Sequence, residues 1–328
     1  MPVWSWVRTR WAGSWGQKAT TTQMDADAAG TTTEVLDLLA DLRGEIGQIH
    51  RELDVIISPA EPITVGATTP SGGVVDVRVL GGFSVFVDDR AVEWSGRRAS
   101  RNLFQLLLQR HPQPINREVL MEALWPEADP ASARNRLNVA LHDLRKQLRA
   151  AGVADDIVVH EGPVYRLNPG IELRIDETEF IAGVDVLLDG SRDLDADAVD
   201  RLSAVVGLYQ GDYLGTEPYE EWTMERRRYL RRLYISAQDV IARARLEEGR
   251  LEACIDACRR ITEIEEAHEV AHRRMITALA RAGRVSEALL QFDICADNLA
   301  DGLGVEPSEQ TLQLIRDIRS GAGPRVDE

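Results

Sequence analysis

The sequence has few of the features that mark an exported, membrane-bound or catalytic protein. Its three cysteines form no CxxC pair, and no hydrophobic run is long enough for a secretory signal or a membrane span. These absences indicate a protein of the reducing cytoplasm without a disulfide framework. Cys254 and Cys258 are four residues apart on a predicted helix, which suits a metal or redox pair or, more simply, two small buried packing residues. Neither a Gly-rich phosphate loop with its lysine nor a GxSxG motif occurs, so we expect no enzyme, no cofactor and no metal.

The chain is also short of positive charge, with a formal net charge of −16. This balance argues against a nucleic-acid-binding protein, because neutralising phosphates supplies much of the affinity of such proteins. The charge is uneven, however. Residues 74–170 hold 13 basic and 12 acidic side chains, whereas residues 171–328 hold 20 and 33. The acidity resides mostly in the C-terminal half, so the middle of the chain remains compatible with DNA binding.

The stretch from Asp129 to Leu148 predicts one helix with two different faces. The Asp129 side chain can cap the first turn, and Pro130 suits the first helical position, where no N–H is needed. At about 100° per residue one face is apolar: Ala133, Leu137, Ala140, Leu141, Leu144 and Leu148. The opposite face is polar: Asn135, Asn138, Val139, His142, Lys146 and Arg149, flanked by Arg136 and Arg145. A solvated surface helix has such a pattern too, so the neighbouring segments must show whether this helix belongs to a DNA-binding domain.

Those neighbours have the order of a winged-helix DNA-binding domain. Alternating strands around Gly81 and Gly82 come first, and a helix is predicted over Arg98–Gln109. A second helix, Asn116–Leu124, precedes the two-faced helix. A hairpin follows it, pairing Ile157–Val159 with Tyr165–Leu167. The two-faced helix is therefore predicted to be the recognition helix, and residues 130–149 carry five basic side chains against Asp143 alone.

Several blocks in the same order resemble the Streptomyces antibiotic regulatory protein (SARP) family over residues 75–320. Besides the two-faced helix they are VRVLGGFSVFVDDRAV (77–92), VYRL (164–167), LYQGDYL (208–214), YEEW (219–222), GRVSEAL (283–289) and LGVEPS (303–308). The resemblance implies an OmpR-type winged helix followed by a bacterial transcriptional activator domain. It also implies activation from promoter direct repeats, self-association, recruitment of RNA polymerase through its sigma factor, and control of an antibiotic or other secondary-metabolite gene cluster. The family usually has a basic residue near Asp143, so this position departs from the pattern. The Asp143 carboxylate can instead select a cytosine amine or pair with Arg136 or Lys146.

The expected fold is mostly α, with a winged helix of α+β type and small sheets followed by an all-α, tetratricopeptide-like domain. Gly249 and Gly283 lie in similar segments 34 residues apart, which is the tetratricopeptide length. The expected organisation is a Trp-containing tail (1–30), an amphipathic or coiled-coil helix (31–58), a linker (59–73), the winged helix (74–170), the activator domain (171–320) and a tail (321–328).

The N-terminal segment offers two interpretations. Apolar residues repeat from Val35 to Ile56 at steps of four and three, which indicates a short self-associating helix and hence a homodimer. A single amphipathic helix packed on its own chain explains the same pattern. The four tryptophans between Trp4 and Trp15 lie in a stretch without helical periodicity, where they can anchor a partner or a membrane surface.

Candidate DNA contacts follow from the predicted placement. They are Arg97, Arg98, Arg101, Arg117, Arg134, Asn135, Arg136, Asn138, Val139, His142, Arg145, Lys146, Arg149, Tyr165 and Arg166. Asn135, Asn138, His142 and Lys146 are the expected readers of base edges, since Asn pairs with adenine and Lys with guanine acceptors. Arg136 and Arg145 are expected to flank the groove.

Two functions are compatible with the sequence. The first is a cytoplasmic, nucleoid-associated transcriptional activator whose partners are promoter DNA, the RNA polymerase sigma factor and core, and a second copy of the chain. The second is a protein-interaction adaptor built on the helical repeats, without DNA binding. The arginine cluster from Arg226 to Arg232 is compatible with an acidic partner, with DNA or with nearby carboxylates.

Overall fold

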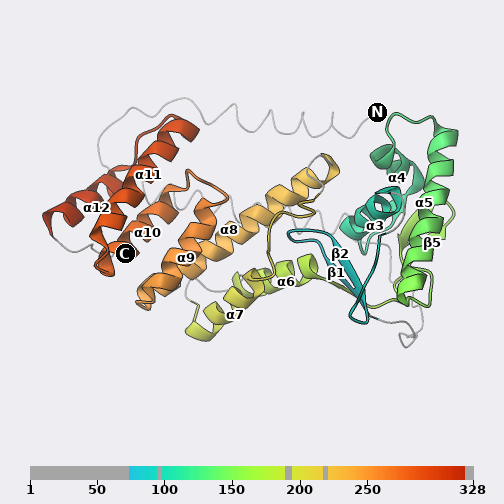
Figure 1. Cartoon of the computed structure of the whole chain (residues 1–328), viewed down its shortest axis with the longest axis horizontal. Coiled ribbons are helices and arrows are strands. Elements are labelled where there is room, and N and C mark those ends of the chain that lie inside the picture. Colours follow the sequence, from blue (N-terminus) through green and yellow to red (C-terminus); the bar gives the residue numbers. More distant parts are fainter. Residues whose placement is uncertain (1–73, 95–97, 189–193, 217–220, 322–328) are drawn as a thin grey trace, which may run out of the picture. The chain divides into compact units, whose positions relative to one another are not determined.

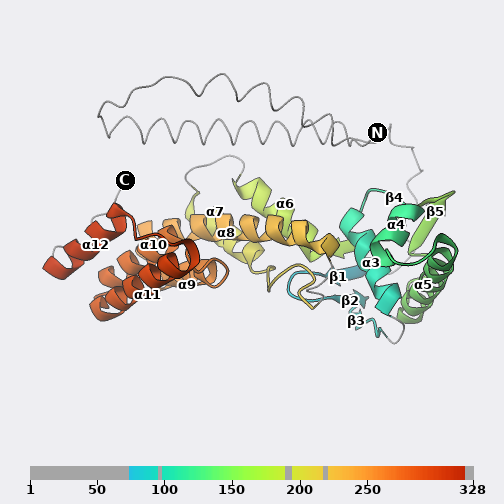
Figure 2. The ribbon, with the colours of Figure 1, turned by 90° about the horizontal axis from the view of Figure 1, so that it is seen from above.

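The structure, a computed structural model, describes residues 74–94, 98–188, 194–216 and 221–321 (Figures 1 and 2). The expected tail, N-terminal helix and linker (1–73), as well as Arg97 and residues 322–328, lie outside the described residues. A four-stranded sheet comes first, with the order β3-β2-β1-β7. Its strands are β1 (Val75–Arg78), β2 (Ser84–Val87), β3 (Arg90–Ala91) and β7 (Leu173–Ile175). β1 pairs antiparallel with β2 and parallel with β7.

β7 lies in the segment that we expected to open the activator domain. It is a strand of the first sheet because Val75, Asp76 and Val77 pair with it residue for residue. Three residues are too few for an alternating pattern to stand out in the sequence. The activator-domain helices therefore begin directly from an edge strand of this sheet.

Three helices lie between β3 and β7 in the chain: α3 (Arg98–Arg110), α4 (Arg117–Leu124) and α5 (Pro130–Ala151). The Asp129 carboxylate accepts hydrogen bonds from two N–H groups in the first turn of α5. Hydrogen bonding by the side chain of Ser132 first, and then by these N–H groups, holds the pKa of Asp129 below its usual value. The helix ends at Gly152, which has a left-handed conformation. All six residues of the predicted apolar face are buried. The amphipathic pattern is thus confirmed, and α5 runs three residues beyond Leu148.

The predicted hairpin after α5 is confirmed as part of a second sheet, with the order β4-β6-β5. Its strands are β4 (Ile115–Asn116), β5 (Val158–Glu161) and β6 (Val164–Leu167). Val158 pairs with Leu167 and Glu161 with Val164, so the turn lies at Gly162 as expected. β4 ties this wing to the N-terminus of α4, where the Asn116 side chain accepts a hydrogen bond from Glu118 N.

The remainder of the described chain is helical. After α6 (Asp176–Leu188) and α7 (Ala196–Val206) come a short 3₁₀ turn, Glu221–Thr223, and the helices α8 (Met224–Glu247), α9 (Leu251–Thr262), α10 (Glu269–Arg281), α11 (Val285–Leu303) and α12 (Glu309–Ser320). Gly249 turns α8 into α9 and Gly283 turns α10 into α11, with nearly equal φ angles of +74° and +75°. The two helix pairs repeat the same geometry, as the spacing of the glycines predicts. Cys254 and Cys258 are buried and unbridged in the first pair.

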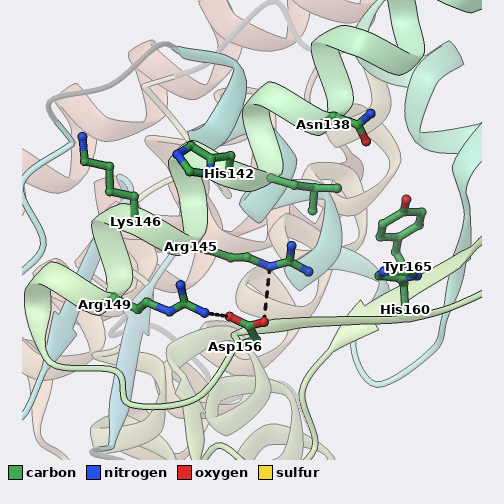
Figure 3. Close-up of a pocket in the computed structure, with 9 residues that line it drawn as sticks. Asn138, His142, Arg145, Lys146, Arg149, Asp156, His160 and Tyr165 are labelled. Atoms are coloured by element: carbon green, nitrogen blue, oxygen red, sulfur yellow. Dashed lines mark hydrogen bonds and ion pairs between the residues drawn. The ribbon is translucent and has the colours of Figure 1, made fainter.

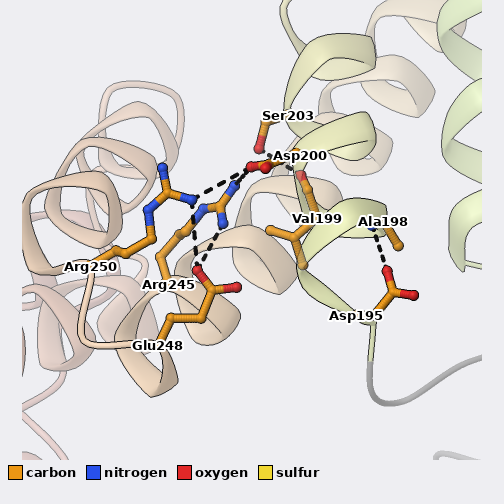
Figure 4. Close-up of polar contacts among 8 residues, drawn as sticks. All are labelled: Asp195, Ala198, Val199, Asp200, Ser203, Arg245, Glu248 and Arg250. Carbon is orange, nitrogen blue, oxygen red and sulfur yellow. Dashed lines mark hydrogen bonds and ion pairs between the residues drawn. The ribbon is translucent and has the colours of Figure 1, made fainter.

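A buried arginine joins α7 to the turn between α8 and α9 (Figure 4). Arg245 is 3% exposed, and its guanidinium forms ion pairs with Asp200 and, at 2.8 Å, with Glu248. Arg250 reaches the same two carboxylates at 3.6 and 3.8 Å. Burial alone lowers the pKa of Arg245, but the hydrogen bonds to Glu248 and Asp200 outweigh it and raise the pKa. The cluster fixes α7 against the repeat helices.

Backbone and side-chain bonds join the first sheet to the helical part. The Asp176 carboxylate, at the start of α6, accepts from Val79 N at 2.9 Å and from Leu80 N at 3.1 Å. Leu80 forms an isolated bridge with Tyr213, and Leu214 N donates to Val79 O at 2.7 Å. The segment LYQGDYL thus lies along the end of β1. Tyr213 is fully buried there, which gives this block of the resemblance a packing role.

Candidate nucleic-acid interface

The candidate readers lie on the exposed side of α5. Asn135, Asn138, Val139, His142 and Lys146 are exposed, and so are Arg134, Arg136 and Arg149. The helix is anchored from below by its buried leucines and alanines, so this face is rigid rather than carried on a loop. α5 therefore presents amide, imidazole and ammonium groups to solvent on one face.

α5 and the wing enclose a surface groove of about 560 Å³ (Figure 3). Asn138, His142 and Lys146 line it from the helix, and His160 and Tyr165 line it from the wing. Residues up to 27 positions apart in the sequence thus meet in one concave surface.

Two arginines at the C-terminal end of α5 bind the wing. Arg145 Nη2 donates to the carbonyl of Val158 at 2.9 Å, and its side chain is 26% exposed. Arg149 forms an ion pair with Asp156, whose other oxygen lies 3.9 Å from Arg145 Nε (Figure 3). Arg145, expected to flank the groove, therefore also holds the wing against the helix.

The wing candidates differ in exposure. Tyr165 is only 7% exposed, and its ring lies tilted against that of His160 with 5.3 Å between the ring centroids, so the tyrosine supports the groove wall. Arg166 is more open and lies 3.7 Å from Glu161 across the hairpin. Of these side chains, His160 is the exposed one in the groove, and it is not among the contacts predicted from the sequence. Its place in the strand opposite Tyr165 was the signal that could have found it.

The other margin of α5 faces α3. A smaller hollow of about 280 Å³ is lined there by Asn135, Arg136, Val139 and Asp143, with Trp125 beside them. Asp143 thus belongs to this margin and not to the wing groove. Within the described ranges no ion pair joins it to Arg136 or Lys146, the two partners that the sequence suggested.

The remaining candidates lie near helix starts. Arg98 is exposed, whereas Arg101 is partly buried with its guanidinium carbon 6.0 Å from the centre of the Phe83 ring. Burial, and secondarily the charge of Arg98, lower the pKa of Arg101. Arg117 is a quarter exposed and pairs with Glu118 at 3.3 Å. Arg98 is thus the most accessible of the three.

Comparison with known proteins agrees with this geometry. The model of the C-terminal domain of transcriptional regulatory proteins matches residues 92–167, and the model of the bacterial transcriptional activator domain matches residues 175–319. Regulatory protein DnrI of Streptomyces peucetius is 28% identical over 245 residues, which are 70% of this chain and 86% of that protein. The chain is a SARP-type transcriptional regulator.

Two mycobacterial proteins extend this assignment. Transcriptional regulatory protein MoaR1 of Mycobacterium tuberculosis is 24% identical to this SARP-type regulator over 286 residues, covering 80% of the chain and 91% of MoaR1. The structure of Mycobacterium tuberculosis EmbR in complex with a low-affinity phosphopeptide superposes with a TM-score of 0.61 at 25% identity. The match covers 77% of the present chain and 66% of the EmbR chain, so about a third of EmbR has no counterpart in it. The mostly helical fold with an N-terminal winged helix is thereby shown.

The arginine cluster on α8 of the SARP-type regulator is largely used internally. Arg226 pairs with Glu177, Arg231 donates to Asp212 at 2.6 Å, and Arg227 donates to the carbonyls of Tyr213 and Leu214 at 2.7 and 2.9 Å. These bonds reinforce the junction between the first sheet and the helices. Nearby groups thus bind three of the five arginines of the cluster.

One motif was missed in the expectation that the regulator has no metal. His268, Glu269 and His272 form an HExxH sequence, the spacing with which zinc proteases place two ligands on a helix. The ring of His268 instead caps α10. The buried ring of His272 donates to the carbonyl of Glu266 at 2.8 Å and accepts from the amide of Gln291 at 2.6 Å, and burial lowers its pKa.

The middle residue of that motif binds α12. Glu269 Oε1 accepts from Ser308 N at 2.7 Å and from the hydroxyls of Ser308 and Thr311 at 2.6 Å. Burial raises the pKa of Glu269, but these hydrogen bonds outweigh it and the net shift is downward. An anion is favourable at this helix N-terminus. All three residues of the motif thus have packing partners, and in the described part of the chain no three His, Cys, Asp or Glu side chains are grouped to hold a metal ion.

The repeat helices of the regulator form a second groove, of about 470 Å³, between α9, α10 and α11. Its apolar lining includes Leu290 and Ile294, which are 59% and 40% exposed one turn apart on α11. Glu263 and Glu266 also line it, whereas the arginines that line it are paired, Arg259 with Asp256 at 2.8 Å and Arg284 with Glu287 at 2.6 Å. In the described residues, no helix has the length and hydropathy needed to cross a membrane.

Proposed function

We propose that this protein activates transcription by laying α5 into the major groove of promoter DNA. The single observation that carries the proposal is the groove between α5 and the wing, where exposed Asn138, His142 and Lys146 share one concave, cation-bearing surface. An α-helix with its side chains fits the major groove, and these side-chain types pair with base edges there. Arg98, Arg134 and Arg136 serve as phosphate contacts, which position the domain without reading sequence.

The direct experiment is a mobility-shift assay of the full chain on promoters next to its gene and on random duplexes of equal length. Binding that prefers one promoter by at least about tenfold supports a sequence-specific regulator, since specific sites exceed non-specific ones by far more than tenfold in such proteins. Equal binding to all duplexes would exclude a sequence-specific regulator, and no binding to any of them would leave the adaptor function as the better explanation. The operators are proposed to be direct repeats beside a secondary-metabolite cluster, as the family resemblance implies.

The groove between α9 and α11 is proposed as the contact for RNA polymerase holoenzyme. Exposed apolar residues at i and i+4 beside carboxylates suit an amphipathic, basic helix of a partner. Replacing Leu290 and Ile294 together by Lys is expected to lower transcription in vitro at least about fivefold, because loss of two central apolar anchors costs 1 kcal/mol or more. DNA affinity of the variant should match the wild type. Undiminished transcription would exclude this groove as the contact.

Homodimerisation is proposed on the repeated apolar residues from Val35 to Ile56, which lie outside the described residues. Deleting residues 1–60 should then lower the mass seen by light scattering to that of a single chain. An unchanged mass would leave the activator domain as the site of self-association.

A further inference from the structure

Asp156 occupies a position between the two arginines at the C-terminal end of α5. It precedes β5, and its carboxylate projects toward the guanidinium groups of Arg145 and Arg149 (Figure 3). All three side chains line the groove proposed to receive DNA. A carboxylate there offers the arginines two negatively charged acceptor oxygens, as a DNA phosphate does.

The two arginines differ in how firmly they are held. Arg145 is 26% exposed and is also bound to the carbonyl of Val158, so its position does not depend on Asp156. Arg149 is 56% exposed, and among the described residues its ion-pair partner is Asp156, which is 42% exposed. Exposed pairs of this kind contribute only about 0–1 kcal/mol. A phosphate can therefore replace Asp156 at Arg149 at little cost, but the cost is present in every DNA complex.

We propose that Asp156 is an intramolecular competitor of DNA phosphate. In the free protein it holds Arg149 against the wing, and it thereby lowers the affinity for all DNA without reading sequence. The inference rests on the proposed DNA-binding function and assigns Asp156 as a positioning residue that acts through Arg149. The base-reading side chains of α5 then account for a larger share of the free energy by which the promoter is bound.

The neighbouring Asp155 provides a matched control. It is exposed, it carries the same charge, and it does not line the groove. Asp155→Asn and Asp156→Asn change the net charge of the protein equally, so long-range electrostatics affects both variants alike. Any difference between them reports the contact with the arginines.

The experiment measures fluorescence anisotropy of the full chain on a promoter duplex and a random duplex across a range of salt concentrations. Asp156→Asn is expected to bind both duplexes about two- to fivefold more tightly than Asp155→Asn, the range that an exposed ion pair allows. The slope of log K against log salt should stay close to that of Asp155→Asn, because Arg149 contacts a phosphate in both complexes. The ratio of the affinities for the promoter duplex and the random duplex should stay unchanged. In a protein that already carries Arg149→Gln, adding Asp156→Asn should raise the DNA affinity no more than adding Asp155→Asn does.

Equal affinities of the two Asn variants, or a gain that persists without Arg149, would overturn the proposal. If Asp156→Asn unfolds at a lower temperature because the wing has lost its ion pair with α5, the test uses Arg149→Gln instead. It should then weaken both duplexes and flatten the salt slope by about 0.9, and an unchanged slope would overturn the proposal. A wild type that shows no sequence preference refutes the proposed function. If the wild type prefers its promoter but the two Asn variants bind DNA with equal affinity, this inference alone is refuted.

Discussion

Replacing Asn138 and His142 together by alanine is expected to leave a folded protein that binds DNA but no longer prefers its promoter. Both side chains are exposed, so their removal opens no cavity, and alanine is the best helix former. A good contact to a base edge contributes about 1–3 kcal/mol of discrimination. The promoter should therefore lose tenfold or more in affinity, whereas random DNA loses little.

Competition binding with promoter and random duplexes checks this prediction. Arg98→Ala is the contrasting variant. Loss of a phosphate contact at the start of α3 should weaken binding to both duplexes alike and flatten the salt dependence of binding. An unchanged preference in the Asn138 and His142 double variant would show that α5 does not read the sequence. Thermal unfolding of the variant at the wild-type temperature would exclude a folding defect as the cause.

Gly81→Ala is expected to destabilise the protein by about 2–3 kcal/mol. Gly81 has φ of +106°, and a Cβ at this position would lie 3.0 Å from the carbonyl carbon of Gln210, which is backbone and cannot swing away. Its N–H also donates to Asp212 O at 3.1 Å, so a shift of Gly81 would break the junction of the first sheet with LYQGDYL. Both the strain and the close approach penalise a side chain.

Gly82→Ala is the matched control, since no atom lies within 4 Å of a Cβ there and its φ is not positive. That variant should stay within about 0.5 kcal/mol of the wild type, as surface substitutions usually do. Urea unfolding followed by circular dichroism gives both values. Equal stabilities of the two variants would contradict the role assigned to this junction.

Much of the α5 surface could be predicted from the sequence because it depends on neighbours along one helix. The cap at Asp129 follows from the type of that residue before the helix, and the buried face from Ala133 to Leu148 follows from a period of 3.6 residues. Both can be recognised in this stretch of sequence alone. The same applies to the repeat, where Gly249 and Gly283 turn successive helices with almost the same φ. These features need no knowledge of what packs against them.

Other parts of the site depend on residues that are distant in the sequence. That Tyr165 is buried behind His160, that Asp143 faces α3, and that Arg145 holds Val158 follow from how the wing and α3 meet α5. The HExxH spacing of His268 and His272 likewise predicts a metal site until the partners of each ring are known.

The sequence by itself determined the long helices, the wing hairpin and which face of α5 is polar, because these depend on local periodicity and capping. Only the tertiary structure decided that Asp156 meets Arg149 and that β7 completes the first sheet. Such contacts are set by packing between elements, where the geometry of the whole domain, and not the order of residues, determines which side chains come within bonding distance.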